Sequence, residues 1–232
     1  MTFFDKLRAG GERTAAAPAR SGALSPSTAD SNRRPSNGLK DFLWLLSDVQ
    51  QGQLLDLGPV SQATVSFFTG RGFKIYSDDL LRAWRGFLDA EENRLRASST
   101  KPAKEAEFSL SVLAQKFLQS SVAYPPESFH AILVWDLLDY LEEELLADLV
   151  SRFYAMLRPG GVVLGLFHSK KPEAFHRYRI PDADTIELYQ ASAPCAPLRL
   201  LQNRDLMKLF AAFRSSKTFV GRDQLREGLF LK

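Results

Sequence analysis

The stretch that most constrains the fold is residues 53–72, which read QLLDLGPVSQATVSFFTGRG. A short apolar run ends at Asp56 and Gly58, and a helical pattern follows and stops at Gly70. A buried parallel strand, a tight turn and a helix produce this pattern, and together they open a doubly wound α/β domain. In such domains the ligand lies at the carboxyl end of the first strand, above the helix N-terminus. The turn at residues 56–58 is therefore the first candidate site.

A second strand is predicted at residues 73–77, and the acids Asp78 and Asp79 follow it. Asp79 lies 23 residues after Asp56, close to the spacing at which an acid at the second strand's end holds a ribose. A carboxylate suits this task because it accepts both hydroxyl protons. The alternative is that these acids cap the helix beginning at Leu80, since Asp is a favoured N-cap residue. Both interpretations stay open, with Asp79 preferred to Asp78 as the ribose ligand.

The apolar periodicity of the remaining chain predicts alternating helices and strands. We expect helices at residues 39–49, 80–95, 108–120, 142–157 and 203–213, and strands at 130–135, 162–167, 217–220 and 229–231. A turn at 181–184 between two alternating segments predicts a β-hairpin at 178–189. A third strand is either a short run near 117–122 or irregular. Right-handed crossovers then give a Rossmann-like three-layer α/β/α sandwich with a mostly parallel sheet of roughly seven strands.

Composition sets the expected domain limits and excludes several classes of function. Residues 1–37 are rich in Ala, Ser, Pro, Gly and Arg, so we expect a disordered basic tail before one folded domain at residues 38–232. This tail accounts for the whole net charge of +3, and the neutral remainder offers no basic face for nucleic acid. One cysteine and three histidines argue against a metal site. The chain shows no membrane-spanning run and no signal peptide, so a cytosolic location is expected.

Several segments together carry a resemblance to a known family. They are LLDLG at residues 54–58, the spacing of Asp79, SFHAILVWDLLDYL at 128–141 and MLRPGGVVLGLFH at 156–168. Over about residues 39–231 the sequence resembles the class I S-adenosylmethionine-dependent methyltransferases. An NAD-binding Rossmann enzyme shares the first turn and the acid after the second strand. The Arg-Pro-Gly-Gly helix end and the two terminal strands favour the methyltransferase family.

The resemblance implies S-adenosylmethionine as the cofactor and assigns residues to its parts. It also implies a partial lid from residues 39–44 and from the hairpin at 178–189. The second adenine contact of the family follows the third strand and stays unassigned. The implied cofactor ligands are Asp56, Leu57, Gly58, Pro59 and Ser61 for the methionine part, Asp79 for the ribose, Leu80 near the adenine, and Asp136 near the methyl group or the amino-acid end.

The first turn departs from the family pattern Asp-x-Gly-x-Gly-x-Gly, because only Gly58 is kept and Val60 and Gln62 replace the later glycines. Those glycines let the backbone approach the cofactor and let the helix pack on the strand. Pro59 removes one N–H donor while stiffening the turn, and Ser61 is expected to compensate by capping the following helix. The turn is therefore either a modified cofactor site in an enzyme, or a lost one in a catalytically inactive methyltransferase-fold protein that acts as a binding or scaffold module.

Methyl transfer from a sulfonium requires mainly that the two reactants are oriented, and a base is needed only for weakly acidic nucleophiles. The candidate catalytic residues are His168, which follows the strand at 162–167, and then Asp136 and Tyr140, although a lone histidine is more often structural or solvated. No Asn-Pro-Pro-Tyr follows the strand at 130–135, which argues against methylation of the amino groups of nucleic-acid bases. A small molecule is the preferred acceptor, and a protein side chain is the alternative.

Overall fold

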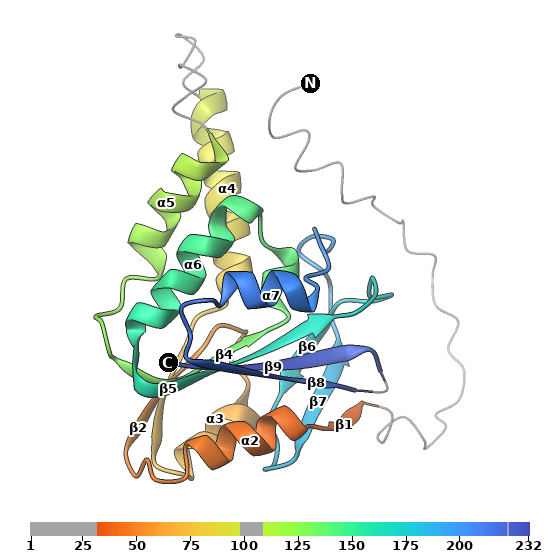
Figure 1. Ribbon diagram of the computed structural model, residues 1–232. Coiled ribbons are helices and arrows are strands. Elements are labelled where there is room, and N and C mark those ends of the chain that lie inside the picture. Colours follow the sequence, from red (N-terminus) through yellow and green to blue (C-terminus); the bar gives the residue numbers. More distant parts are fainter. Residues whose placement is uncertain (1–31, 98–108, 222) are drawn as a thin grey trace.

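The computed structural model describes residues 32–97, 109–221 and 223–232 (Figure 1). Most of the expected tail, residues 1–31, lies outside these ranges. The described chain forms two sheets. One has six strands in the order β3-β2-β4-β5-β9-β8, and the other has three strands in the order β1-β7-β6.

The large sheet is parallel over its first four strands, and β9 runs antiparallel to both β5 and β8. These directions confirm a Rossmann-like α/β fold with a mostly parallel sheet, although the sheet has six strands where about seven were expected. The two terminal strands close the sheet as predicted. Its strands are β3 Phe73–Ser77, β2 Gly52–Asp56, β4 Phe129–Trp135, β5 Leu157–His168, β9 Leu225–Leu231 and β8 Ser215–Val220.

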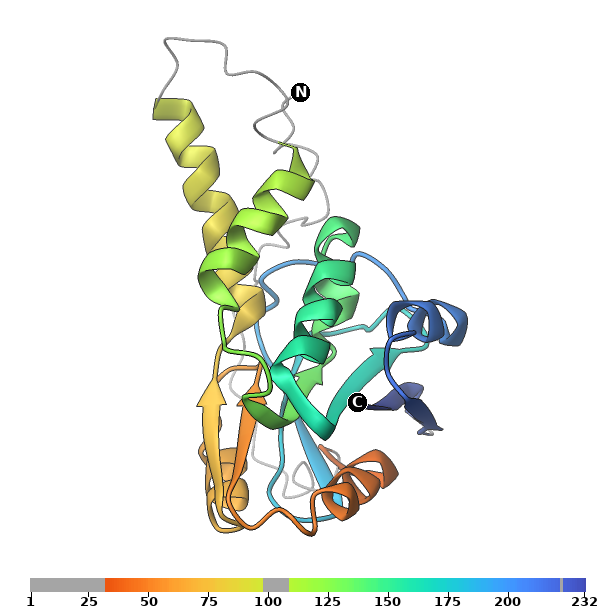
Figure 2. The same ribbon diagram turned by 60° about the vertical axis from the view of Figure 1, so that its left-hand side comes forward.

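Helices cover both faces of the large sheet, and each face has its own apolar core (Figures 1 and 2). Within β4, Ile132 and Val134 face one core while Leu133 and Trp135 face the other, as expected for a strand buried on both sides. None of the helices in the described ranges has the length and hydropathy needed to cross a membrane. One face carries α2 Asn37–Leu45 and α3 Gln62–Thr69, and the other carries α4 Leu80–Ala97, α5 Leu110–Ser121, α6 Glu143–Met156 and α7 Asn203–Leu209.

The third strand, which the sequence left unplaced, does not occur among the described residues between β3 and β4. The run near residues 117–122 belongs to α5 and the turn after it, so its interpretation as a strand is wrong. Its apolar side chains, Leu113, Phe117 and Leu118, recur at helical spacing and are buried in one core. Figure 2 shows α4 and α5 rising beyond the sheet. As a result β3 is the edge strand of the large sheet.

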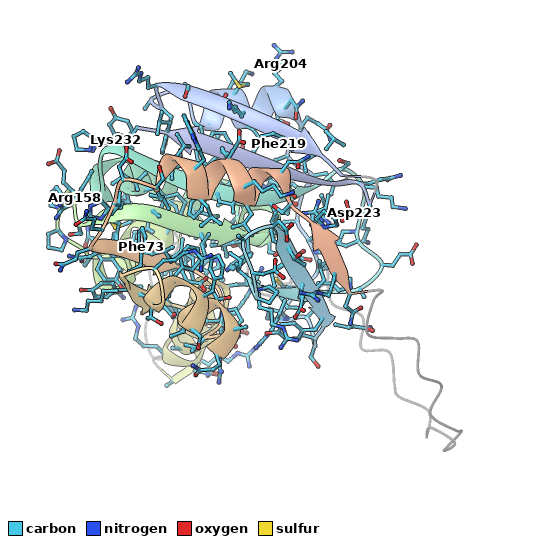
Figure 3. The ribbon with its side chains drawn as sticks, turned by 90° about the horizontal axis from the view of Figure 1, so that it is seen from below. Phe73, Arg158, Arg204, Phe219, Asp223 and Lys232 are labelled. Carbon is cyan, nitrogen blue, oxygen red and sulfur yellow. The ribbon has the colours of Figure 1, made fainter. Side chains whose placement is uncertain are left out.

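The predicted hairpin is present as β6 His176–Arg179 and β7 Thr185–Gln190, and β1 Arg33–Pro35 pairs with β7. The buried Arg34 fastens β1 to the loop before β9 and to β9 itself. Its Nη1 donates to Glu227 Oε1 at 2.6 Å and its Nε donates to Asp223 Oδ2 at 2.7 Å. Figure 3 shows Asp223 beside β1. Residues 33–37, which composition assigned to the tail, are therefore part of the folded unit.

Candidate functional site

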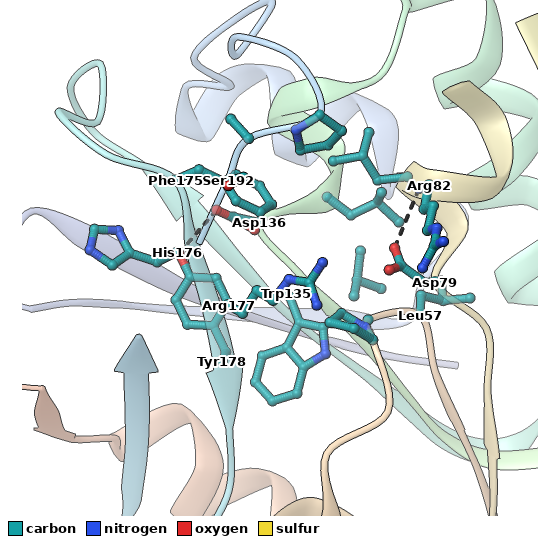
Figure 4. A pocket seen from close by; sticks show the side chains of 17 residues that line it. Leu57, Asp79, Arg82, Trp135, Asp136, Phe175, His176, Arg177, Tyr178 and Ser192 are labelled. Carbon is teal, nitrogen blue, oxygen red and sulfur yellow. Dashed lines mark hydrogen bonds between the residues drawn. The ribbon is translucent and has the colours of Figure 1, made fainter. Parts of the chain in front are cut away.

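A cavity of about 330 Å³ lies at the carboxyl ends of β2, β3 and β4, and we call it the strand-end pocket (Figure 4). Its volume lies within the range of small-molecule sites, roughly 300–1,000 Å³. The carboxyl edge of a doubly wound sheet is also where such folds bind their ligands. The lining comes from the turn after β2 (residues 57–59), the start of α4 (79, 81 and 82), the end of β4 (134–137), the hairpin (175–178) and residues 192–194.

The turn after β2 is closed by its own hydrogen bonds. Asp56 Oδ1 accepts the backbone N–H of Gly58 at 3.0 Å and the indole Nε1–H of Trp135 at 2.6 Å. The N–H of Leu57 donates to the carbonyl of Leu133 at 2.9 Å, and Pro59 has no N–H. Residues 57–59 therefore leave no backbone donor for a ligand. Burial raises the pKa of Asp56 to about 6, although both hydrogen bonds act in the opposite direction.

Trp135 forms the floor of the strand-end pocket. A Cβ at Gly58 would lie 2.6 Å from its Nε1, so only glycine leaves room for the indole. The Trp135 ring stacks on Tyr178, with 5.7 Å between ring centroids and 8° between planes. Trp135 also holds a φ of +52°, a backbone conformation that is uncommon outside glycine and concentrates at functional sites. Sequence reasoning missed this role, because it treated Trp135 only as the last residue of a strand.

Asp136 lines the pocket, and two side chains contact one oxygen of its carboxylate. The hydroxyl of Tyr178 donates to Asp136 Oδ2 at 3.0 Å, and His168 Nε2 lies 3.0 Å from the same oxygen. Burial, followed by the neighbouring Asp136 carboxylate, raises the pKa of Tyr178 well above its usual value. His168 does not line the cavity, so it reaches the pocket only through Asp136.

Tyr140, another candidate from the sequence, lies in the core and not in the pocket lining. It is 1% exposed and meets Phe175 edge to face at 5.3 Å. Burial raises its pKa above the ordinary value. Its neighbour Asp139 was not singled out from the sequence. Asp139 accepts the N–H groups of His168 at 2.8 Å and Leu201 at 3.4 Å, and burial raises its pKa to about 6.

The acids after β3 have separate roles. Asp79 lines the pocket and also caps α4, because its Oδ1 accepts the N–H of Arg82 at 3.3 Å (Figure 4). The N–H of Asp78 donates to the carbonyl of Asp56 at 2.8 Å, and burial raises the pKa of Asp78. Leu80 is fully buried in the core outside the lining. Ser61 occupies the N-cap position of α3 without a side-chain capping bond, so the expected compensation by its hydroxyl is wrong.

The hairpin supplies one wall of the pocket, as the implied lid requires, whereas residues 39–44 do not. In α2 the side chains of Leu39 and Phe42 pack in the core beneath the sheet, so the expected lid from this helix is wrong. Two arginines, Arg82 and Arg177, also line the cavity, and neither forms an ion pair with any residue that the structure describes. Among the residues that the structure describes, no three His, Cys, Asp or Glu side chains are arranged to hold a metal ion.

No protein-family model matches this chain, and no curated protein has a matching sequence. Solved structures are similar in fold at low identity. The 1,6-didemethyltoxoflavin-N1-methyltransferase of Burkholderia thailandensis, with its substrate and S-adenosylhomocysteine bound, is 15% identical with a TM-score of 0.42, over 84% of this chain and 78% of that one. The glycopeptide N-methyltransferase MtfA, complexed with S-adenosylmethionine, is 13% identical with a TM-score of 0.37, over 89% and 99%. TehB from Haemophilus influenzae is 12% identical with a TM-score of 0.41, over 83% and 61%.

Because these TM-scores lie below 0.5, the fold assignment depends on the strands themselves. The parallel order β3-β2-β4-β5, extended by antiparallel β9 and then β8, defines a Rossmann-like domain closed by two terminal strands. From the sequence, those terminal strands and the Arg-Pro-Gly-Gly helix end are the two features that favour a methyltransferase over an NAD-binding enzyme. The strands thus confirm the Rossmann-like α/β fold that the sequence resemblance implies.

Proposed function

We propose that this protein transfers a methyl group from S-adenosylmethionine to a small molecule or a protein side chain, and that it does so in the cytosol. The observation that carries the proposal is the convergence of Gly58, Asp79 and Asp136 at one cavity, from the ends of three parallel strands. These are the positions to which the family resemblance assigns the methionine part, the ribose and the methyl end of the cofactor.

The residues at the nucleoside end suit this cofactor. One oxygen of Asp79 caps α4, and the other has no partner among the described residues and is free for a ribose hydroxyl. Leu57, Leu81 and Val134 add an apolar wall that would exclude water from a flat base. At the methionine end, Asp136 would attract the cofactor's ammonium group. The bound cofactor would supply a methyl group activated on a cationic sulfur.

The chain's own contribution is the orientation of the two reactants. Tyr178 and His168 occupy Asp136 Oδ2, while Oδ1 has no partner among the residues described. Asp136 Oδ1 is thus left to hold the cofactor's ammonium group, beside an acceptor placed above Trp135. His168 and Tyr178 act as positioning residues that fix the rotation of this carboxylate. The hairpin and the apolar lining would keep water away from the reacting groups.

Calorimetric titration with S-adenosylhomocysteine tests the proposal. The wild type is expected to bind at micromolar concentration, and Asp79→Asn to bind about tenfold more weakly, because asparagine still caps the helix but loses the charge and one acceptor. Asp89→Asn is the matched control, since Asp89 is exposed on the same helix outside the pocket. Absence of both heat and thermal shift at millimolar ligand would refute cofactor binding.

The second candidate is a catalytically inactive binding module with this fold. The closed hydrogen bonding of the turn favours it, because Asp56, Gly58 and Trp135 satisfy one another and residues 57–59 offer no N–H to a ligand. The same titration separates the two candidates. If the folded wild type does not bind S-adenosylhomocysteine, the inactive module is supported. If it binds and Asp79→Asn weakens the binding, the enzyme is supported.

A further inference from the structure

The cofactor's methionine part carries a carboxylate, and the part of the turn that lines the pocket, residues 57–59, has no free backbone N–H. The N–H groups of Leu57 and Gly58 are already bonded within the protein, and Pro59 has none. The nearby charges make the problem worse, because Asp56 and Asp136 are both acids. A ligand carboxylate at this end of the pocket therefore requires a cationic side chain from elsewhere.

Arg177 is the cation in the right place. It is half-buried on β6, and Figure 4 shows its guanidinium beside Trp135, whereas Arg82 lies beside Asp79 at the ribose end. Its charge is uncompensated among the described residues. By contrast, Arg179 on the same strand pairs with Glu187 at 2.5 Å. Asp79 and Asp136 line the same cavity, but no described carboxylate forms an ion pair with Arg177. A half-buried guanidinium without an ion pair is typical of a site that receives an anion.

The backbone that carries Arg177 is held firmly. The next residue, Tyr178, stacks on Trp135 and donates to Asp136. Two residues further on, the N–H of Ile180 donates to Thr64 Oγ1 of α3 at 3.0 Å. Because β6 is fixed to the floor of the pocket and to α3, the fold determines where the Arg177 side chain starts and which part of the pocket it can contact. His176 also lines the cavity, but its ring points away from the other side chains in Figure 4.

We propose that Arg177 binds the carboxylate of the cofactor's methionine part and so replaces the backbone donors that residues 57–59 lack. This inference rests on the proposed function. The guanidinium would form two parallel hydrogen bonds to the carboxylate oxygens, the geometry in which arginine is most selective for carboxylates. The anion thereby neutralises Arg177, and Asp136 remains available for the ammonium group.

A cycle of two ligands and several variants tests this pairing. The ligands are S-adenosylhomocysteine and its decarboxylated form, which keeps the amino group and lacks only the carboxylate. The proteins are the wild type, Arg177→Gln, Arg179→Gln as a control on the same strand, and Arg82→Gln as a control at the ribose end. Calorimetry gives each Kd, and the difference between the two ligands in each protein isolates the contribution of the carboxylate.

Arg177→Gln is expected to weaken S-adenosylhomocysteine about 10- to 100-fold and to leave the decarboxylated ligand bound as well as before or better. In Arg179→Gln and Arg82→Gln the ratio between the two ligands should match that of the wild type. Equal losses for both ligands in Arg177→Gln, or no loss for either, would overturn the proposal. A wild type that binds neither ligand would instead refute the proposed function, so the two failures are distinguishable.

Discussion

Trp135 donates its indole N–H to Asp56 at 2.6 Å and thereby joins the carboxyl ends of two neighbouring strands, β4 and β2. Both side chains are nearly buried, at 6% and 2% exposed. The bond satisfies a carboxylate that has left water, and it fixes the indole over the turn.

Replacement of the indole should destabilise the fold. In Trp135→Phe, Asp56 loses a donor that it cannot replace with water, so the free energy of unfolding should fall by about 1–3 kcal/mol. Urea denaturation measures this change. Trp44→Phe is the control, since Trp44 is 72% exposed and surface changes of this kind cost less than about 0.5 kcal/mol. Equal losses in the two variants would contradict a structural role for the bond.

Removal of the charge on Asp56 should raise the free energy of unfolding at neutral pH, the opposite of the effect expected for Trp135→Phe. The pKa of Asp56 is about 6 in the folded protein against 3.8 for the ordinary group. The folded state therefore binds more protons between these values, and stability falls as pH rises through that window. Above it the buried charge costs about 2–3 kcal/mol, at 1.36 kcal/mol per pKa unit.

Asp56→Asn keeps an oxygen for both hydrogen bonds, because Gly58 and Trp135 share Oδ1. Relative to wild type, the variant should gain stability at about pH 8 and lose that advantage near pH 4. Urea denaturation of both proteins across this range measures the difference. The raised pKa of Asp139 affects both proteins alike and cancels in the comparison. A pH-independent difference would show that the Asp56 carboxylate does not titrate as described.

A methyl group at position 58 should also lower the stability of the fold. The Cβ of Gly58→Ala would press on Trp135 Nε1 at 2.6 Å, and such overpacking costs about 1–3 kcal/mol. Gly86→Ala, inside α4, is the matched control, since its Cβ would have no atom within 4 Å. That control should gain about 0.5–1 kcal/mol from helix propensity. Thermal unfolding of both variants tests the contrast, and a harmless Gly58→Ala would mean that Trp135 moves freely.

The Arg34 contact should be among the most sensitive in the N-terminal part of the described chain. Arg34→Met would leave Glu227, 2% exposed, without its cation, and an unpaired buried charge costs about 3–5 kcal/mol. Arg33→Met is the adjacent control, because the Arg33 side chain is 46% exposed and its ion pairs contribute less than about 1 kcal/mol. Chemical denaturation of both variants measures how much free energy of unfolding each one loses. Similar small losses would indicate that β1 is only loosely held.

The sequence predicted most elements closely because their apolar spacing is a local property. The strand expected at residues 130–135 is found at Phe129–Trp135, and the helix expected at 142–157 is found at Glu143–Met156. The small sheet was only half predicted. Its hairpin has a local turn, but β1 pairs with β7 across about 150 residues, and Arg-Arg-Pro carries no strand pattern of its own.

The site shows the same division between local and distant information. The positions of Gly58, Asp79 and Asp136 follow from sequence, because the carboxyl ends of parallel strands meet at one edge of a sheet. The parts played by Trp135 and Arg177 do not follow. They depend on a left-handed backbone at residue 135 and on how the small sheet docks against the large one.

The closed turn determines where the cost of ligand binding would fall. Asp56, Gly58 and Trp135 hold one another in place before any ligand arrives, so this floor has almost no conformational entropy left to lose. The opposite wall is different, because the long Arg177 side chain has no partner within the described structure and would lose rotamer freedom on binding. Substitutions in the floor should therefore change how stable the protein is, whereas substitutions in the hairpin should change which ligands it selects.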